Sequence, residues 1–161
     1  MSSEGNTLTL ETSKGPVVIE MNPELAPGHV AHIKRLVNEG FYDGIVFHRV
    51  IEGFMAQTGC PHGTGTGGSK YPDLKAEFSA EPHVRGTVSM ARAQSPNSAN
   101  SQFFICFDNA SFLDGKYSVV GEVVAGMDVA DKLKKAPPGS QSGTVTDPDK
   151  MVKVQVASDI K

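Results

Sequence analysis

A chain of 161 residues with 39% hydrophobic and 20% charged residues has the composition of an ordinary globular protein, long enough for one domain with a sizeable core. Its formal net charge of −3 argues against a nucleic-acid binder, which favours a clustered basic face. No apolar run approaches the length of a membrane span, and the N-terminal MSSEGNTLTLE lacks the basic and apolar parts of a secretory signal. Because Cys60 and Cys106 do not form a disulfide framework, we expect a cytoplasmic protein.

Short β-prone runs alternate with turn residues along most of the chain. The first helix is indicated by Val30, Ile33 and Val37 at helical spacing, with Pro27 in its first turn and Gly40 as a left-handed stop. In chain order, the predicted elements are strands at 8–10 and 17–19, a helix at 26–38, a strand pair within 47–59, strands at 87–92, 102–107 and 117–124, a helix at 127–135 and a strand at 151–156.

This order of elements predicts the fold class. The strands are mostly consecutive and are separated by turns, which favours antiparallel pairing. We therefore expect a mostly β protein, a closed eight-stranded antiparallel β-barrel capped by two α-helices. No repeat or linker divides the chain, so residues 1–161 are expected to form a single domain.

The strand pair at 47–59, FHRVIEGFMAQTG, contains the most informative cation. On an alternating strand Arg49 shares its face with Phe47 and Ile51. Beyond a turn at Glu52–Gly53, two large apolar residues and one neutral amide follow, at Phe54, Met55 and Gln57. A planar donor group beside apolar surface is typical of a binding site. On this stretch alone, an arginine that simply extends into solvent from an edge strand is the better interpretation, and the rest of the chain must change that.

Other kinds of site are poorly supported. Gly63, Gly65 and Gly68 match G-x-G-x-x-G, but no amphipathic helix pattern follows, so we expect a flexible surface loop rather than a nucleotide site. His29 with His32, and Cys60 with His62, are too few for a metal site and are expected to be solvated or locally hydrogen-bonded. The sequence also lacks a G-x-S-x-G elbow and a carboxylate pair in an apolar run. We therefore expect no cofactor and no metal.

A second run, SQFFICF, adds to the candidate binding surface. Alternation places Gln102, Phe104 and Cys106 on one face of the strand, and Phe103 and Ile105 on the other. A glutamine two residues from a phenylalanine suits a wet, concave site better than a barrel interior. The candidate surface then comprises apolar and neutral polar residues around one cation: Phe54, Met55, Phe104, Phe112, Leu113, Tyr117, Gln57, Gln102 and Arg49.

At these residues the chain closely resembles the cyclophilin family of peptidyl-prolyl cis-trans isomerases. The matching blocks, in order, are FHRVIEGFMAQTG, GTGTGG, TVSMARA, NSQFFICF and FLDGKYSVVGEV, and the resemblance covers nearly the whole chain. It implies the same capped barrel and a cofactor-free enzyme that accelerates rotation of X–Pro bonds in proline-containing peptides and in unfolded or folded protein clients.

The resemblance also implies a role for each matching residue. Arg49 would be the essential cation. The proline pocket would be formed by Phe54, Met55, Phe104 and Leu113, and its polar rim by Gln57 and Gln102. Ala91, Arg92 and Ala93 would offer their backbone to the peptide, and Gly65 would line the neighbouring groove.

Three positions depart from the vertebrate cytosolic members of the family. Phe112 replaces a tryptophan, Tyr117 a histidine and Arg92 an asparagine. Family members of bacterial type carry the same phenylalanine and tyrosine, so the activity is expected to persist. Cyclosporin A should bind with weakened affinity, because in the family the indole N–H donates to the drug. We expect a compact, bacterial-type cytoplasmic monomer without nucleic-acid or membrane partners.

Two other functions stay open at this point. A non-catalytic module that binds proline peptides could use the same barrel, although such a binder has no need for Arg49. A nucleotide-binding protein could use the glycine loop.

Overall fold

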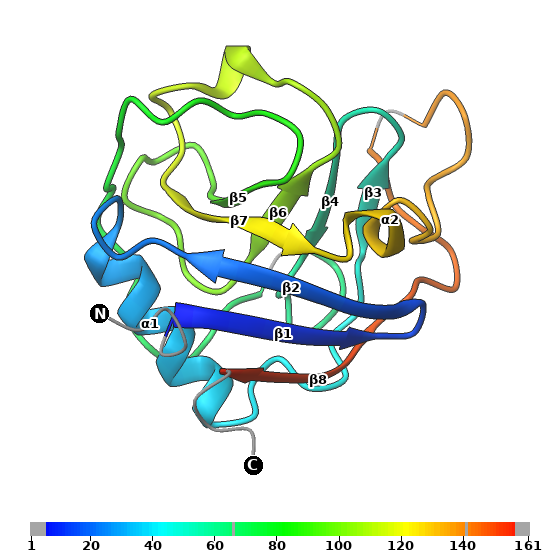
Figure 1. The fold of residues 1–161 in the computed structure, drawn as a ribbon, viewed down its shortest axis with the longest axis horizontal. Helices are drawn as coiled ribbons and strands as arrows, with labels where there is room; N and C mark the ends of the chain where they lie inside the picture. The colour runs from blue at the N-terminus through cyan, green and yellow to red at the C-terminus, as the bar shows by residue number, and fades with distance from the viewer. Residues whose placement is uncertain (1–5, 66, 141, 157–161) are drawn as a thin grey trace.

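The computed structural model describes residues 6–65, 67–140 and 142–156. Eight strands and two α-helices are found in these residues, with one short 3₁₀ helix at Ser111–Leu113 (Figure 1). The strands are β1 (Thr7–Thr12), β2 (Gly15–Met21), β3 (Arg49–Ile51), β4 (Met55–Thr58), β5 (Thr87–Met90), β6 (Phe103–Cys106), β7 (Val119–Ala125) and β8 (Met151–Val156). The helices are α1 (Pro27–Asn38) and α2 (Met127–Ala130).

The strands form one curled antiparallel sheet with the order β3-β4-β6-β5-β7-β2-β1-β8. The predicted closed barrel is therefore wrong, because no strand ladder in the described residues joins the edge strands β3 and β8. The segment that precedes β3 instead approaches the first residue of β8 and the residues before it. The N–H of Gly44 donates to the Met151 carbonyl at 2.6 Å, and the N–H of Phe47 donates to the Asp149 carbonyl at 2.8 Å. Irregular backbone pairing thus forms a seam where the prediction placed a ladder.

The helices lie at different ends of the sheet, with α1 packed against β8 and α2 beside β2 (Figure 1). Helix α1 begins at Pro27, within one residue of the prediction, and Gly40 with φ of +75° ends it as expected. Its buried residues recur at helical spacing: His29, Val30, His32, Ile33, Leu36 and Val37. Helix α2 is shorter than predicted and ends at Ala130 rather than Lys135. Past the helix, the backbone N–H of Lys134 donates to the Asp149 carboxylate at 2.7 Å.

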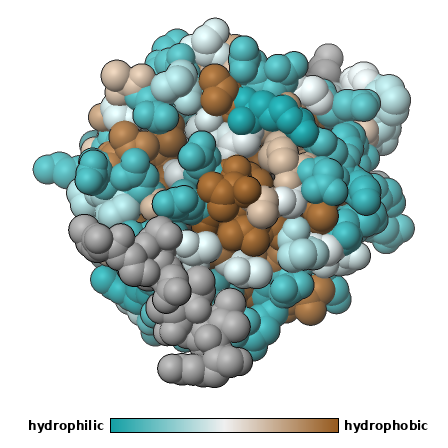
Figure 2. Space-filling model, viewed as in Figure 1, coloured by the Kyte–Doolittle hydropathy of each residue, from teal (hydrophilic) through white to brown (hydrophobic). Residues whose placement is uncertain are grey.

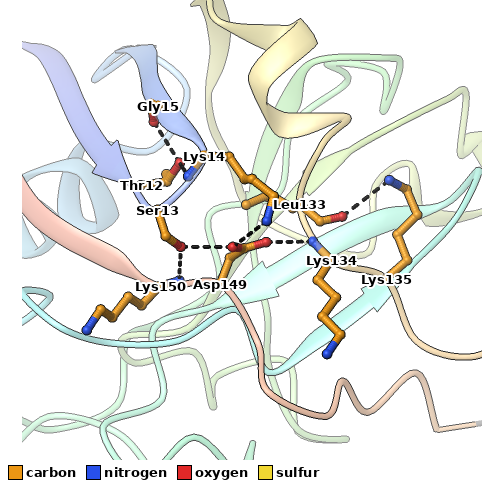
Figure 3. Close-up of polar contacts among 9 residues, drawn as sticks. All are labelled: Thr12, Ser13, Lys14, Gly15, Leu133, Lys134, Lys135, Asp149 and Lys150. Atoms are coloured by element: carbon orange, nitrogen blue, oxygen red, sulfur yellow. Dashed lines mark hydrogen bonds and ion pairs between the residues drawn. The ribbon is translucent and has the colours of Figure 1, made fainter.

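Asp149 connects three segments that are distant in the sequence (Figure 3). Its carboxylate, which is 8% exposed, accepts hydrogen bonds from the Ser13 hydroxyl and the Lys14 ammonium, both at 2.9 Å, as well as from Lys134. Burial raises the pKa of this carboxyl, but the Lys134 N–H and the Lys14 and Ser13 side chains outweigh that effect, and the pKa lies below its ordinary value. The carboxylate thereby joins the β1–β2 turn, the segment after α2 and the chain that leads into β8.

Two separate apolar clusters lie against the sheet. The larger one is the main core and includes Val50, Phe103 and Ile105 together with the buried face of α1. The smaller one contains Met55, Phe104, Cys106, Ala110 and Leu113. Figure 2 shows a face of the molecule that is hydrophilic around its rim, with hydrophobic residues gathered near the centre, where Figure 1 places β2 and β7.

Candidate active site

Arg49 opens β3 and lies at the rim of an apolar cavity. Its Nε donates to the Ser142 carbonyl at 2.9 Å, and its Nη1 donates to Gln57 Oε1 at 3.3 Å. Gln57 lies opposite Arg49 in the β3–β4 ladder, which explains why the two side chains meet. In the described residues no ion pair of Arg49 is found, so its charge is held by neutral oxygens. The interpretation of a solvent-directed arginine does not describe this environment.

A chain of amides extends from the arginine. Gln57 Nε2 donates to Gln102 Oε1 at 2.9 Å, and Gln102 Nε2 donates to the carbonyls of Gly65 and Gly67 at 2.9 and 3.0 Å. The glycine loop therefore orients Gln102, which orients Gln57 beside the guanidinium. This order of donors and acceptors determines where the oxygen and the nitrogen of each glutamine amide lie.

The loop is in turn held by Cys60. The N–H groups of Gly65 and Gly67 both lie 3.3 Å from Cys60 Sγ. Burial alone would raise the pKa of the thiol, but backbone N–H groups, first among them that of Gly67, bring it down to about 6. No helix is found at residues 67–86, directly after the glycines, so the dinucleotide-binding context is absent there.

The apolar cavity beside Arg49 has a volume of about 140 Å³. Most of the predicted site residues line it: Arg49, Phe54, Met55, Gln57, Ala91, Arg92, Phe104, Leu113 and Tyr117. The base belongs to the smaller apolar cluster, in which Met55 is 2% and Phe104 5% exposed. A small ring is the kind of group that a cavity of this size and lining accommodates.

A second cavity of about 570 Å³ adjoins the first, and Gln57, Ala91 and Arg92 line both. Its lining includes three more residues of the predicted site, at Gly65, Ala93 and Gln102. Phe112 is the one predicted residue that lines neither cavity. It is 62% exposed, with its ring centroid 5.6 Å from that of Phe54.

Arg92 lies between the two cavities and is held on several sides. Its Nε and Nη2 donate to the Lys116 carbonyl at 3.0 and 2.7 Å, and its Nη1 donates to the Ala93 and Gln94 carbonyls. The guanidinium also lies over the Tyr117 ring, 4.7 Å from the centroid. The side chain thus fixes the backbone at 93–94 and 116 beside the cavity.

The sequence did not indicate a buried histidine behind the cavity wall. His83 Nε2 lies 3.0 Å from Ser89 Oγ and its Nδ1 lies 3.1 Å from Asp114 Oδ1, while its ring stacks on Phe104 at 6.2 Å between centroids. The backbone N–H of His83 is the largest cause of a lowered pKa at Asp114. The only signal for this histidine was its position just before the strand at 87–92.

The Ser142 carbonyl was also missed, because a backbone oxygen leaves no signal in a sequence. One face assignment is wrong: Phe47 belongs to the main core with Val50, whereas Ile51 packs on the smaller cluster with the cavity. Strand alternation does not extend back to residue 47, because β3 begins only at Arg49.

The histidines of α1, expected to be solvated or locally hydrogen-bonded, are buried, and His29 is hydrogen-bonded. His29 is 0% and His32 4% exposed, and His29 Nε2 lies 2.8 Å from the Lys75 carbonyl.

In the described residues, no group of three or more histidine, cysteine or acidic side chains has the arrangement of a metal site. Among the described residues, no helix combines the length and the apolar character of a membrane span.

Comparisons with known proteins identify the family of this fold and site. A family model described as cyclophilin type peptidyl-prolyl cis-trans isomerase/CLD matches residues 7–156. A probable peptidyl-prolyl cis-trans isomerase of Brucella suis biovar 1 is 56% identical over 167 residues, covering 97% of this chain and 85% of the relative. Peptidyl-prolyl cis-trans isomerase B of Bacillus subtilis is 47% identical over 119 residues, covering 73% of this chain and 82% of the relative.

Solved structures that resemble this fold belong to the same family. A cyclophilin from Hirschia baltica superposes with a TM-score of 0.85 at 33% identity, over 98% of this chain and 76% of that one. A cyclophilin-type isomerase from Cryptosporidium parvum, crystallised in the presence of the dipeptide Ala-Pro, gives a TM-score of 0.84 at 26% identity, over 93% and 98%. This chain belongs to the cyclophilin-type peptidyl-prolyl cis-trans isomerases. It is an enzyme that accelerates rotation about X–Pro peptide bonds.

Proposed function

We propose that Arg49 is the catalytic residue of this isomerase and that the cavity of about 140 Å³ holds the ring of the substrate proline. The observation that carries the proposal is the position of the guanidinium. It lines an apolar cavity while neutral oxygens of Ser142 and Gln57 fix its Nε and Nη1. In the described residues, no acceptor of Nη2 is found, which leaves donor groups for a substrate.

The chemistry requires no bond to be made or broken. Rotation about an X–Pro bond has a barrier of about 20 kcal/mol, because the C–N bond has partial double-bond character. In the twisted state the proline nitrogen regains a lone pair. A donor directed at that nitrogen binds the twisted state better than either planar state and therefore lowers the barrier. Arginine remains charged across the physiological pH range, so it can donate throughout.

The arginine cannot account for the whole rate enhancement. A gain of about 10⁵ requires about 7 kcal/mol. A hydrogen bond from a charged group contributes only about 1.5–3 kcal/mol. We propose that the rest comes from the cavity, where Phe54, Met55, Phe104 and Leu113 hold the proline ring and exclude water while the preceding carbonyl rotates.

The remaining site residues would hold the peptide around that ring. Gln57 and Gln102 form the polar rim, Ala91, Arg92 and Ala93 offer backbone to an extended peptide, and Gly65 lines the adjoining groove. The wider cavity of about 570 Å³ beside them supports this role, because a bound peptide needs space beyond the proline. We place Phe112 and Tyr117 at the periphery, where Phe112 contacts Phe54 and Tyr117 lines the smaller cavity.

We also propose that the substrates are proline-containing peptides and protein clients, and that the enzyme works as a cytoplasmic monomer. The Ala-Pro dipeptide present with the Cryptosporidium parvum relative supports a proline ligand. Cys60 and Cys106 are both buried and free, which is compatible with a reducing compartment.

Substitution of Arg49 tests the central role. Arg49→Ala should lower kcat/KM at least about tenfold, equivalent to about 1.4 kcal/mol of transition-state stabilisation, in an NMR exchange or protease-coupled assay. Arg85→Ala is the matched control, since Arg85 pairs with Asp131 at 2.6 Å and lines neither cavity. An Arg49→Ala enzyme that isomerises prolyl peptides as fast as the Arg85→Ala enzyme would rule out the proposed role.

A further inference from the structure

The segment that follows α2 returns to the free edge of β3 just where Arg49 lies. The N–H of Val50 donates to the Gly143 carbonyl at 3.0 Å, and the N–H of Val145 donates to the His48 carbonyl at 3.1 Å. Thr144 forms an antiparallel bridge with Arg49 itself. The backbone at 143–145 therefore acts as a short added strand beside β3, and Val145, 6% exposed, anchors it in the main core.

The same backbone also holds the arginine side chain. The Ser142 carbonyl accepts the Nε–H of Arg49 at 2.9 Å. Hydrogen bonds within the segment keep that carbonyl in place: the N–H of Gly143 donates to Ser140 Oγ at 3.1 Å, and Ser142 Oγ donates to Thr144 Oγ1 at 3.1 Å. Because Nε belongs to the rigid plane of the guanidinium, fixing it sets the direction of both Nη groups.

Gly143 fits this position because it has no side chain. Its φ is +74°, and a Cβ built on it would lie 2.7 Å from Ile51 Cγ1 and 3.0 Å from Arg49 Cγ. The distance to Ile51 is shorter than carbon atoms tolerate and the distance to Arg49 is tighter than most, so any larger residue must push the segment away from β3 or displace the Ile51 side chain and the stem of Arg49. The close approach of backbone to side chain is the feature that permits the Ser142–Arg49 hydrogen bond.

We infer that Gly143, by letting the Ser142 carbonyl reach Arg49 Nε, is a positioning residue for the guanidinium. The inference rests on the proposed catalytic role of Arg49. It assigns the two sides of the guanidinium to different parts of the fold: Gln57 of β4 orients Nη1, and the segment at 142–145 orients Nε. A donor that acts on a twisted imide must be aimed within a fraction of an ångström, and misplacement by about 1 Å can cost about 10²-fold in rate.

The chain supplies a matched control in Gly139. This glycine lies in the same connection and has φ of +83°, but a Cβ built on it meets nothing within 4 Å. Gly139→Ala and Gly143→Ala therefore impose the same backbone strain, and they differ in the contact with Arg49 and Ile51. We expect Gly143→Ala to lower kcat about tenfold or more with little change in KM, and Gly139→Ala to leave both unchanged.

A spectroscopic readout separates positioning from general destabilisation. The Arg49 Nε–H signal, assigned by its loss in Arg49→Lys, should shift and exchange faster with solvent in Gly143→Ala but not in Gly139→Ala. If Gly143→Ala does not fold, Ser140→Ala carries the same test, because it removes the hydroxyl that accepts the Gly143 N–H. That variant should lower kcat and perturb the same signal.

A double substitution distinguishes the failure of this inference from the failure of the proposed function. If Gly143 acts through Arg49, adding Gly143→Ala to Arg49→Ala should lower kcat no further. Full activity of Arg49→Ala would remove the catalytic role itself. An impaired Arg49→Ala together with a fully active Gly143→Ala and an unchanged Nε–H signal would overturn the positioning role alone. An additive loss in the double variant would also overturn it.

Discussion

Strands β4 and β6 carry apolar side chains on both faces, yet the two faces are completed differently. On the inner face, Ala56 and Ile105 lie in the main core, the same cluster that includes the buried residues of α1. On the outer face, Met55 and Phe104 pack with Ala110 and Leu113, the Phe104 ring also contacts His83 and Tyr117, and a cavity remains beside them. An inner side chain contributes mainly packing, whereas an outer one also borders space that a ligand can fill. The difference lies in what covers each face, not in the strands themselves.

The largest effect is expected on the inner face. Ile105 is 0% exposed, so Ile105→Ala leaves a cavity that the surrounding core cannot fill, and it should cost about 2–5 kcal/mol of unfolding free energy. Urea unfolding measures this cost, and kcat/KM of the folded fraction should stay near wild type. A large loss of activity at unchanged stability would contradict the assignment of Ile105 to packing rather than to the site.

A smaller loss of stability is expected at Asp149, where the segment before β3 meets the chain that leads into β8. Asp149→Asn removes the charge that Ser13, Lys14 and Lys134 surround and should cost about 1–3 kcal/mol at pH 7. Because the pKa of Asp149 is lowered in the folded protein, its contribution is complete above the unfolded pKa of about 3.9 and is lost as pH falls through the folded value. Stability measured from pH 7 to pH 2 should fall more steeply in wild type than in Asp149→Asn. Parallel pH profiles would contradict this role.

On the outer face, a substitution should lower the activity more than the stability. Phe104→Leu nearly preserves the apolar character and should cost less than about 1.5 kcal/mol of stability. It should nevertheless lower kcat/KM about tenfold, equivalent to about 1.4 kcal/mol, because the wall shared with His83 and Tyr117 no longer fits a proline ring. Ile105→Val, one residue away on the inner face, is the control and should leave kcat/KM unchanged. Equal activities of the two variants would show that the outer face has no special role.

The smallest effect is expected where the outer face ends, at Phe112. Phe112→Trp restores an indole N–H at an exposed position and should strengthen cyclosporin A binding by about fivefold, the contribution of one hydrogen bond of about 1 kcal/mol. The chain contains no tryptophan, so the new indole also reports binding by its fluorescence. Val124→Trp, at a 50% exposed site on β7 that lines neither cavity, is the control. A titration without a gain over wild type would contradict our interpretation of position 112.

Much of the site could be predicted because it depends on local alternation. Phe104 and Cys106 do share one face of β6, while Phe103 and Ile105 lie in the main core; Gln102 comes just before β6, and its amide meets that of Gln57. The prediction failed where regular structure ends. Phe47 precedes the first residue of β3, so the rule of alternation does not apply to it. Helix α2 ends at Ala130 rather than Lys135, and the N–H of Lys134, which a longer helix would pair with the Ala130 carbonyl, instead donates to Asp149, distant in sequence.

The prediction of a closed barrel failed for a related reason. Sequence patterns indicate strands but not whether two edges that meet form a regular ladder. Here β3 has three residues, and the chain before it pairs irregularly with the start of β8 and the residues just before that strand. The four contacts of Arg92 and the burial of His83 behind Phe104 likewise arise from segments that only the fold brings together.

By itself, the sequence determined the strand and helix pattern, the apolar face of β4 and β6 and the residue types around Arg49, because periodicity and side-chain chemistry are local properties. Only the tertiary structure decided how the guanidinium is held. The carbonyl of Ser142 and the bare Cα of Gly143 have no side-chain signature, and their effect depends on a distance between segments more than 90 residues apart. Such contacts become visible only when the backbone is folded.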